Sequence, residues 1–220
     1  MPRSSCSEVI HSVVTLRNNS MFTRIQCSGI VDADDYDESD KAYLETLGIA
    51  TLPVSEIENL ILLPDVSRAI AVSEGYVDEE LSTRLSNLSE AIFNSVVAPG
   101  AIELVVAQFC RRRIDRILKK IDLSTAKTIS EIEAEYIEKT SSLNILEMAS
   151  DFTSKIQLAI KTRDLPMLLA NYDNKGFVSM AATYLKSCQQ KNFEAWLVRV
   201  LRNGTSPGVK AAISGYLPVI

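Results

Sequence analysis

Residues 29–59 read GIVDADDYDESDKAYLETLGIATLPVSEIEN, in which two short apolar runs flank an amphipathic segment. The apolar runs, extended to residues 25–31 and 49–54, are typical of buried strands, and residues 38–47 have helical spacing that ends at Gly48. A strand, a helix and a second strand with a short return form a βαβ unit, whose strands are parallel and adjacent. We therefore expect a parallel sheet early in the fold.

The rest of the chain has the apolar periodicity of helices. The expected helices, broken at glycine and proline, cover residues 7–17, 55–63, 64–73, 78–97, 101–121, 128–140, 144–163, 176–187 and 192–203, with one more near the C-terminus. The predicted fold class is α/β. A small parallel-sheet core of about residues 1–65 precedes a larger all-helical lobe, residues 66–220, whose C-terminal segment packs back on the core.

Composition indicates a globular protein. The 220 residues are 46% hydrophobic and 23% charged, with a net charge of −5. No apolar run approaches the roughly 20 residues that span a bilayer, and the first residues lack an apolar signal core, so we expect a cytoplasmic protein without membrane contact. The negative net charge means that any nucleic acid must be bound by a local basic patch.

Two acidic pairs follow the two predicted strands. Asp32 and Asp34 come directly after the first strand, and Glu56 and Glu58 follow the second. Residues at i and i+2 of extended chain point the same way, and parallel strands end at one edge of a sheet, so the four carboxylates should converge. Since His11 is the only histidine, any metal site must use carboxylates, which prefer hard cations such as Mg²⁺ or Mn²⁺.

Simpler interpretations of these acids remain open. The acidic loop is also typical of solvated surface, and Ser55 with Glu58 fits a helix capping box. A response-regulator receiver groups acids after its first strand too, although it needs five alternating βα units and this chain becomes helical after residue 55.

Cationic side chains form two further candidate sites. One is a basic face on the predicted helix 101–121, with a lysine beyond it, and it could contact a phosphate backbone: Arg112, Arg113, Arg116, Lys119, Lys120 and Lys127. The alternative is a solvated face paired with acids such as Glu103 and Asp115. The other site is Lys175 in the loop NYDNKG, which either presents a cation to phosphate or belongs to a turn made by Gly176.

Four stretches of the chain resemble a known family. They are GIVDADDYD, GIATLPVSEIENLILLPDV, NYDNKGF and NFEAWLVRVLR with the terminal YLPVI. In this order they resemble a TOPRIM-like domain family associated with ABC-type ATPases. Its members include AriB-like effectors of the PARIS anti-phage systems, and OLD-family nucleases are more distant relatives.

The resemblance implies a TOPRIM core with a helical lobe and metal-dependent hydrolysis of DNA or RNA, with tRNA as one candidate. Asp32 and Asp34 match the family's DxD, and Glu56 and Glu58 match its second acidic element. These acids would hold Mg²⁺ or Mn²⁺, with Asp32, Asp34, Glu56 and Lys175 as catalytic residues. The implied partner is an ABC-type ATPase, encoded nearby, that gates the nuclease in anti-phage defence.

One family feature has no counterpart here. TOPRIM domains carry a catalytic glutamate on a strand before the first helix, whereas only MPRSSC precedes the first predicted helix. Either the chain is a truncated product or it lacks this strand and its acid, and in the second case the alternative function is a catalytically incomplete TOPRIM remnant that binds a partner. A missing strand also exposes a sheet edge, which favours pairing with another chain, for example in a homodimer.

Overall fold

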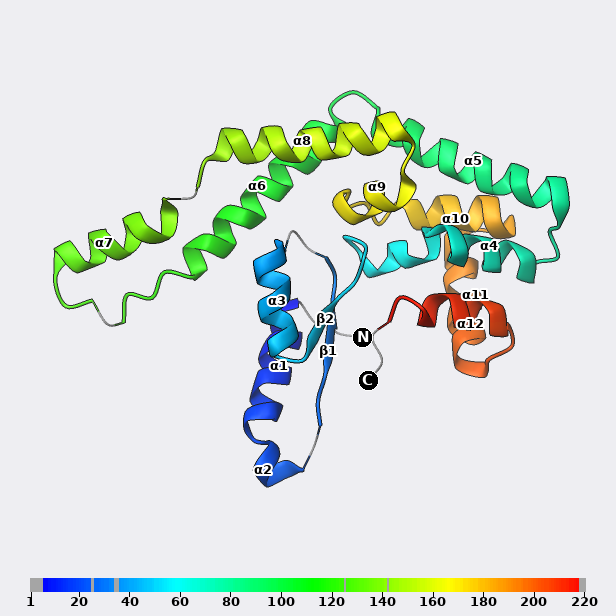
Figure 1. The fold of residues 1–220 in the computed structure, drawn as a ribbon. Coiled ribbons are helices and arrows are strands. Elements are labelled where there is room, and N and C mark those ends of the chain that lie inside the picture. The colour runs from blue at the N-terminus through cyan, green and yellow to red at the C-terminus, as the bar shows by residue number, and fades with distance from the viewer. Residues whose placement is uncertain (1–5, 25, 34–35, 125, 142, 218–220) are drawn as a thin grey trace.

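The computed structural model describes residues 6–24, 26–33, 36–124, 126–141 and 143–217 (Figure 1). The first part contains α1 (Cys6–Asn18), α2 (Ser20–Thr23), β1 (Gly29–Val31), α3 (Glu38–Thr46), β2 (Ile49–Thr51) and the 3-10 helix η1 (Ile57–Leu62). The helices that follow are α4 (Pro64–Ser73), α5 (Asp78–Val96), α6 (Ala101–Lys119), α7 (Ile129–Thr140), α8 (Ile145–Thr162), α9 (Leu165–Asn171), α10 (Phe177–Lys186), α11 (Gln190–Asn203) and α12 (Pro207–Ser214).

The predicted βαβ unit is present. β1 and β2 are parallel neighbours, with Gly29 opposite Ile49, and α3 connects them. Both strands are shorter than the sequence suggested. Pairing begins where Gly29 N–H donates to the Gly48 carbonyl at 3.1 Å, directly after α3 has ended, and Pro53 has no N–H with which to continue the ladder.

The described residues form a sheet of two strands only, so the five-stranded receiver fold is not formed. Helices α1 and α3 cover this sheet and share a small apolar cluster with it, made of Val13, Val31, Leu44 and Ile49. This α/β lobe projects from the rest of the molecule (Figure 1).

A second, larger apolar cluster organises the helices. Its fully buried side chains include Ile70, Ile92, Phe93, Phe177 and Phe193, from α4, α5, α10 and α11. The cluster also takes in Leu52, Val54 and the leucines of η1, which the sequence analysis grouped with the sheet. The protein is therefore mostly helical, with a small two-stranded parallel sheet attached to a helical lobe.

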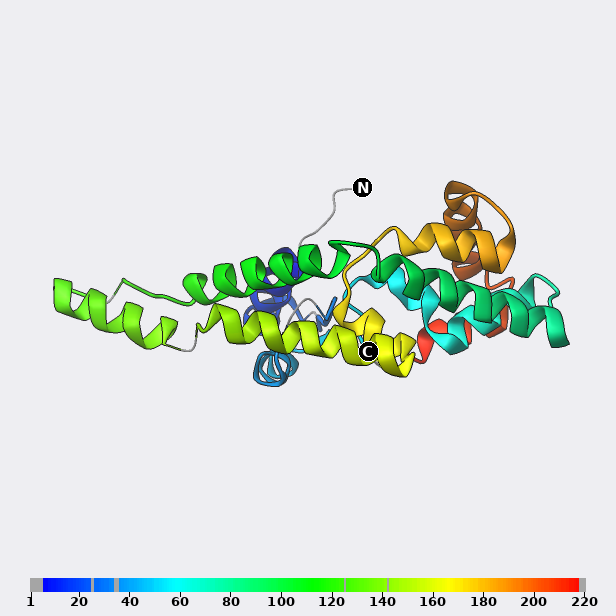
Figure 2. The ribbon, with the colours of Figure 1, turned by 90° about the horizontal axis from the view of Figure 1, so that it is seen from above.

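Helices α6, α7 and α8 form an elongated arm. Helices α6 and α8 pack side by side, and α7 lies at the far end, where no residue of α7 is buried (Figures 1 and 2). At the opposite end of the molecule α12 packs on α4, and the Tyr216 hydroxyl donates to Asp65 Oδ2 at 3.4 Å. The C-terminal segment thus docks at the start of the helical lobe.

Helix α9 was not predicted. Its seven residues, LPMLLAN, are too short for a clear periodicity, but its local signals are strong. The Asp164 side chain accepts from Met167 N–H at 2.9 Å, and Pro166 stands in the first turn, where its missing N–H costs nothing. Leu168 and Leu169 then anchor the helix in the large cluster.

Among the described residues, no single helix is long and apolar enough to span a membrane. Helices α5 and α6 reach the required length and composition only as a pair bent by 74°.

Gly48 provides a test of how α3 ends. Its φ is +76°, and an added Cβ would lie 1.3 Å from Arg17 Nη1, the group that donates to the Leu47 carbonyl at 3.0 Å. Gly48→Ala should therefore lose that hydrogen bond as well as incur backbone strain, and lower the free energy of unfolding by about 2–3 kcal/mol. Chemical denaturation measures the change.

Gly75→Ala is the matched control, since Gly75 has φ +90° with no atom within 4 Å of an added Cβ. It should cost less than Gly48→Ala, by about the 1 kcal/mol of one hydrogen bond. Equal losses for the two variants would contradict a role for Arg17 in ending α3.

Candidate functional site

Glu56 and Lys175, predicted separately, meet at the carboxyl end of the sheet. Glu56 lies between β2 and η1 and is 8% exposed, while Lys175 comes from the loop between α9 and α10. Lys175 Nζ is 2.8 Å from Glu56 Oε2. Because the lysine side chain is about half exposed, it joins a buried carboxyl group to solvent.

Two further residues extend this contact into a network. The Asp173 side chain is hydrogen-bonded to Glu56, and Arg112 Nη1 lies 2.8 Å from Asp173 Oδ2. The Glu56 network is therefore the chain of contacts Lys175, Glu56, Asp173 and Arg112. Asp173 was not predicted, although it stands at i−2 from Lys175, the same spacing that drew attention to the acidic pairs. Arg112, predicted to contact nucleic acid, instead neutralises this carboxylate.

The pKa of Glu56 in this network is unusually high. Burial raises the pKa of Glu56, the adjoining Asp173 raises it further, and Lys175 only partly offsets these effects, so the pKa is about 8. Near neutral pH the Glu56 carboxyl group therefore keeps its proton. A group with such a pKa can donate or accept a proton at neutral pH, which is the property required of a general acid or base.

The segment that carries Glu56 is anchored by its neighbour. The N–H and the hydroxyl of Ser55 both donate to the Leu169 carbonyl of α9, at 2.9 and 3.0 Å. Ser55 is thus occupied elsewhere, and the capping box proposed for Ser55 and Glu58 is not formed.

Glu58 does not join Glu56. Since η1 begins at Ile57, the chain is no longer extended, and the i, i+2 rule fails: Glu56 is buried whereas Glu58 is exposed. The buried polar residue of this helix is Asn59, whose side-chain amide has no hydrogen-bond partner in the described part of the chain. A buried amide without a partner is costly, so Asn59 is a notable feature beside Glu56.

Asp32 lies half-buried at the end of β1, as predicted. The next residue, Ala33, donates its N–H to the Val54 carbonyl at 2.9 Å and so links this loop to the segment that carries Glu56. Asp34 lies outside the described residues. Within them, no three Asp, Glu, His or Cys side chains gather closely enough to hold a metal ion, so Asp32, Glu56 and Glu58 do not by themselves form the predicted site.

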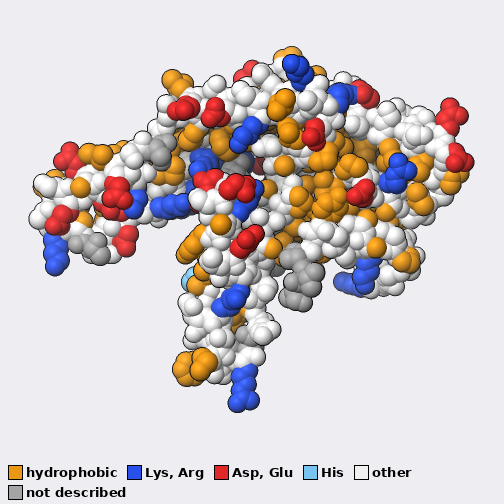
Figure 3. Space-filling model, in the orientation of Figure 1, with side chains coloured by type: hydrophobic (Ala, Val, Ile, Leu, Met, Phe, Trp, Pro, Cys, Tyr) orange, Lys and Arg blue, Asp and Glu red, His pale blue; other side chains and the backbone are white. Residues whose placement is uncertain are grey.

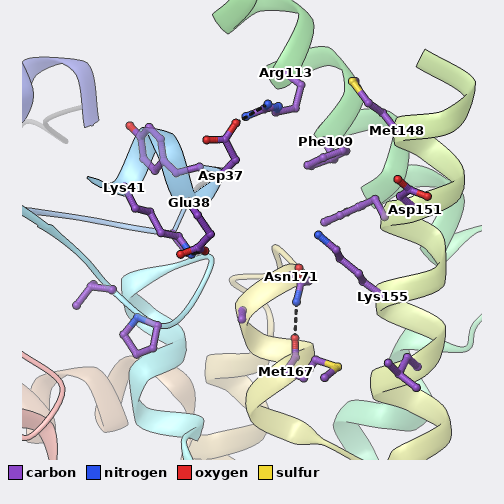
Figure 4. Close-up of a pocket in the computed structure, with 17 residues that line it drawn as sticks. Asp37, Glu38, Lys41, Phe109, Arg113, Met148, Asp151, Lys155, Met167 and Asn171 are labelled. Atoms are coloured by element: carbon purple, nitrogen blue, oxygen red, sulfur yellow. Dashed lines mark hydrogen bonds and ion pairs between the residues drawn. The ribbon is translucent and has the colours of Figure 1, made fainter. Parts of the chain in front are cut away.

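The predicted basic face of α6 is paired with the acidic loop that follows β1. Arg113 contacts Asp37 Oδ2 at 3.1 Å (Figure 4). It also contacts Asp40 Oδ2 at 3.2 Å. Lys120 Nζ lies 2.9 Å from Asp40 Oδ1. The two charged features of the sequence are therefore two halves of one contact, visible in Figure 3 where the α/β lobe meets the arm.

Other members of this face are also occupied. Arg116 lies 3.8 Å from Asp40 and stacks over the Tyr36 ring, with 4.1 Å to its centroid. Lys119 pairs with Asp115 at 2.5 Å, as the simpler interpretation expected for that acid. A phosphate backbone would have to displace these acids before it could contact α6.

Asp37 is the helix cap of α3 as well as a partner of Arg113. Partial burial raises its pKa, but bonds from the Ser39 hydroxyl, Asp40 N–H and Arg113 outweigh that effect and lower the pKa to about 2. The Asp37 carboxyl group is thus ionised at all physiological pH values. Lys127 lies apart from this cluster: it is exposed, and its N–H donates to Glu131 Oε2 at 2.6 Å, beside the capping box that starts α7.

Comparisons with protein-family models, with curated proteins and with solved structures found no match.

Glu56 predicts a pH-dependent stability. Its folded pKa of about 8 lies above the ordinary 4.5, so the folded state holds the proton more tightly. The stability that this bound proton contributes is fully present below pH 4.5 and is lost as the pH rises through about 8. Glu56→Gln, which stays neutral, should match the parent protein most closely at pH 4 and melt roughly 10 °C higher at pH 8.5, the shift for about 4 kcal/mol.

Melting curves of both proteins at the two pH values test this. The control is Glu58→Gln, an exposed neighbour of the same type, whose difference from the parent should not change with pH. A pH-independent difference for Glu56→Gln would show that the raised pKa is wrong.

The contacts of Arg113 predict that its loss lowers the free energy of unfolding. Arg113→Gln should destabilise the fold by about 1–3 kcal/mol, since it leaves the partly buried Asp40 with weaker partners. Arg111→Gln, at an exposed position of the same helix, should change stability by less than about 0.5 kcal/mol. Denaturation at low and high salt measures both. Equal effects of the two substitutions would contradict the pairing.

Proposed function

We propose that this chain is a TOPRIM-like, metal-dependent nuclease that hydrolyses phosphodiester bonds of DNA or RNA, with tRNA among the candidates. The observation that carries the proposal is the 2.8 Å contact between Lys175 and the buried Glu56. The resemblance names both residues, from segments far apart in the sequence, and the fold brings them together at the end of the sheet, where α/β proteins bind ligands.

The side chains near Glu56 offer carboxyl and amide oxygens, which are the type of ligand that a hard cation prefers. Glu56 and Asp173 are adjacent, hydrogen-bonded carboxyl groups, of which Glu56 has a raised pKa, and the buried Asn59 amide still has no partner within the described chain. A divalent cation would relieve the repulsion between the two carboxylates as the proton does. In number the set falls short of three acids, so a complete site also requires the DxD loop, Asp32 and Asp34.

In this proposal Mg²⁺ or Mn²⁺ supplies an activated water molecule and neutralises charge on the phosphate. Lys175 balances the negative charge of the site and, being half exposed, can turn towards a phosphate oxygen. Glu56, with its raised pKa, can hold or release a proton near neutral pH, and Arg112 keeps Asp173 in place. Asp32, at the end of β1, faces the same edge.

The cellular setting follows from the same resemblance. We propose a cytoplasmic effector of anti-phage defence that an ABC-type ATPase restrains or triggers. Because the basic face of α6 is engaged by Asp37 and Asp40, a partner that competes for those arginines could alter the DxD loop.

Cleavage assays test the enzyme. With Mg²⁺ or Mn²⁺, the chain should cut at least one of plasmid, single-stranded DNA and tRNA. Asp32→Ala and Lys175→Gln should each reduce the rate about 100-fold or more, since each removes charge stabilisation at the reacting phosphate. Lys191→Gln, an exposed lysine of α11, should leave the rate unchanged. No cleavage of the three substrates, with or without the ATPase, would contradict the proposal.

The second candidate is a catalytically incomplete remnant that binds a partner protein, an ATPase or another copy of this chain. It is favoured by the lack of three gathered carboxylates among the described residues. The two candidates differ in metal binding: a nuclease should be stabilised by Mn²⁺ in a melting assay, and Glu56→Gln should abolish that stabilisation. A remnant should show no such shift.

A further inference from the structure

A cleft of about 630 Å³ lies where the acidic loop and α3 face helices α6, α8 and α9 (Figure 4). Its walls come from the loop after β1, α3, the segment after β2, α6, α8 and α9, which the sequence gives no reason to associate. Its volume lies in the range of small-molecule sites, roughly 300–1,000 Å³. Glu56, Asp173 and Lys175 do not line it, so it is separate from the Glu56 network.

One wall of the cleft is aromatic. Phe109 of α6 and Phe152 of α8 both line it, and their rings are stacked with centroids 3.9 Å apart and planes 5° from parallel. Phe152 is buried and Phe109 is half-buried, so Phe109 presents the accessible part of this stack. Met148 and Met167 flank it (Figure 4). Flat aromatic ligands stack on such rings, and thioethers adapt to them.

The charges of the cleft are unevenly satisfied. Arg113 is held by Asp37, and Lys41 by Glu38 at 2.8 Å. Lys155 of α8 extends into the cleft and, among the described residues, makes no ion pair, not even with Asp151 one turn earlier (Figure 4). An unpaired cation beside an aromatic wall fits an anionic group attached to a flat ring.

We propose that this cleft binds one nucleotide unit, with the base on Phe109 and the phosphate on Lys155. A base of any sequence can stack on an exposed aromatic ring, and a lysine recognises phosphate as a point charge. The Asp151 carboxylate supplies an acceptor for the sugar hydroxyls or for an exocyclic amino group. Stacking, phosphate and sugar recognition thus converge in one space.

The nucleotide unit has two sources, a free nucleotide or one residue of a single strand. A base pair inside a duplex does not fit this description, because its faces are covered by neighbouring base pairs and stacking on Phe109 needs an uncovered face. The proposal concerns binding alone, so it holds or fails independently of cleavage at the Glu56 network.

Calorimetric titration in EDTA tests the proposal, because without a divalent cation no cleavage can interfere. The ligands are AMP, ATP, adenosine and an eight-nucleotide single strand. Lys155→Gln should weaken AMP or the oligonucleotide about tenfold, and leave adenosine, which has no phosphate, within twofold. Lys161→Gln, an exposed lysine of the same helix that does not line the cleft, should change no affinity by more than twofold.

Phe109→Leu tests the stacking wall with all four ligands, after a melting curve has shown that the variant is folded; it should weaken adenosine as much as AMP. Tighter binding of AMP or ATP than of the oligonucleotide identifies a free nucleotide as the ligand, and the reverse order identifies a single strand. Absence of binding by every ligand at 1 mM would overturn the proposal. So would equal losses in Lys155→Gln and Lys161→Gln, because they would indicate general attraction by positive charge.

Discussion

The arrangement of the molecule depends on the pairing between the acidic loop after β1 and the basic face of α6. The apolar cluster of the α/β lobe contains only four buried residues and is separate from the large helical cluster. Arg113 and Asp40 are only 18% and 12% exposed in their side chains, so their attraction is screened less than that of surface charges. The lobe is therefore held against the arm by charge, while Ile30 and Leu52 join the sheet to the large helical cluster.

That constraint also shapes the functional surfaces. Asp37 and Arg113 both line the cleft, so the contact that joins lobe and arm also forms part of the cleft wall. The same loop starts at Asp32, directly after β1. The arginine contacts thus lie between the end of β1 and the cleft.

The Glu56 network differs from the loop contact, in which opposite charges pair, because it brings two acids together. Their proximity has a cost, which is met by the proton that Glu56 retains and by Lys175 and Arg112 at either end. Buried groups with displaced pKa values are concentrated at functional sites. The fold tolerates this site because Ser55 ties the segment to α9 and the surrounding helices share one large core.

The sequence by itself determined the local elements: the βαβ unit, Gly48 as the end of α3 and the long helices were all predicted, because periodicity and turn residues act within a few positions. It also identified Glu56 and Lys175 as residues of interest. Only the tertiary structure decided the partners. The capture of the α6 arginines by Asp37 and Asp40, the role of Asp173 and the cleft beside Lys155 all involve residues distant in sequence. A charge attracts any opposite charge, and which one it meets depends on how the helices pack.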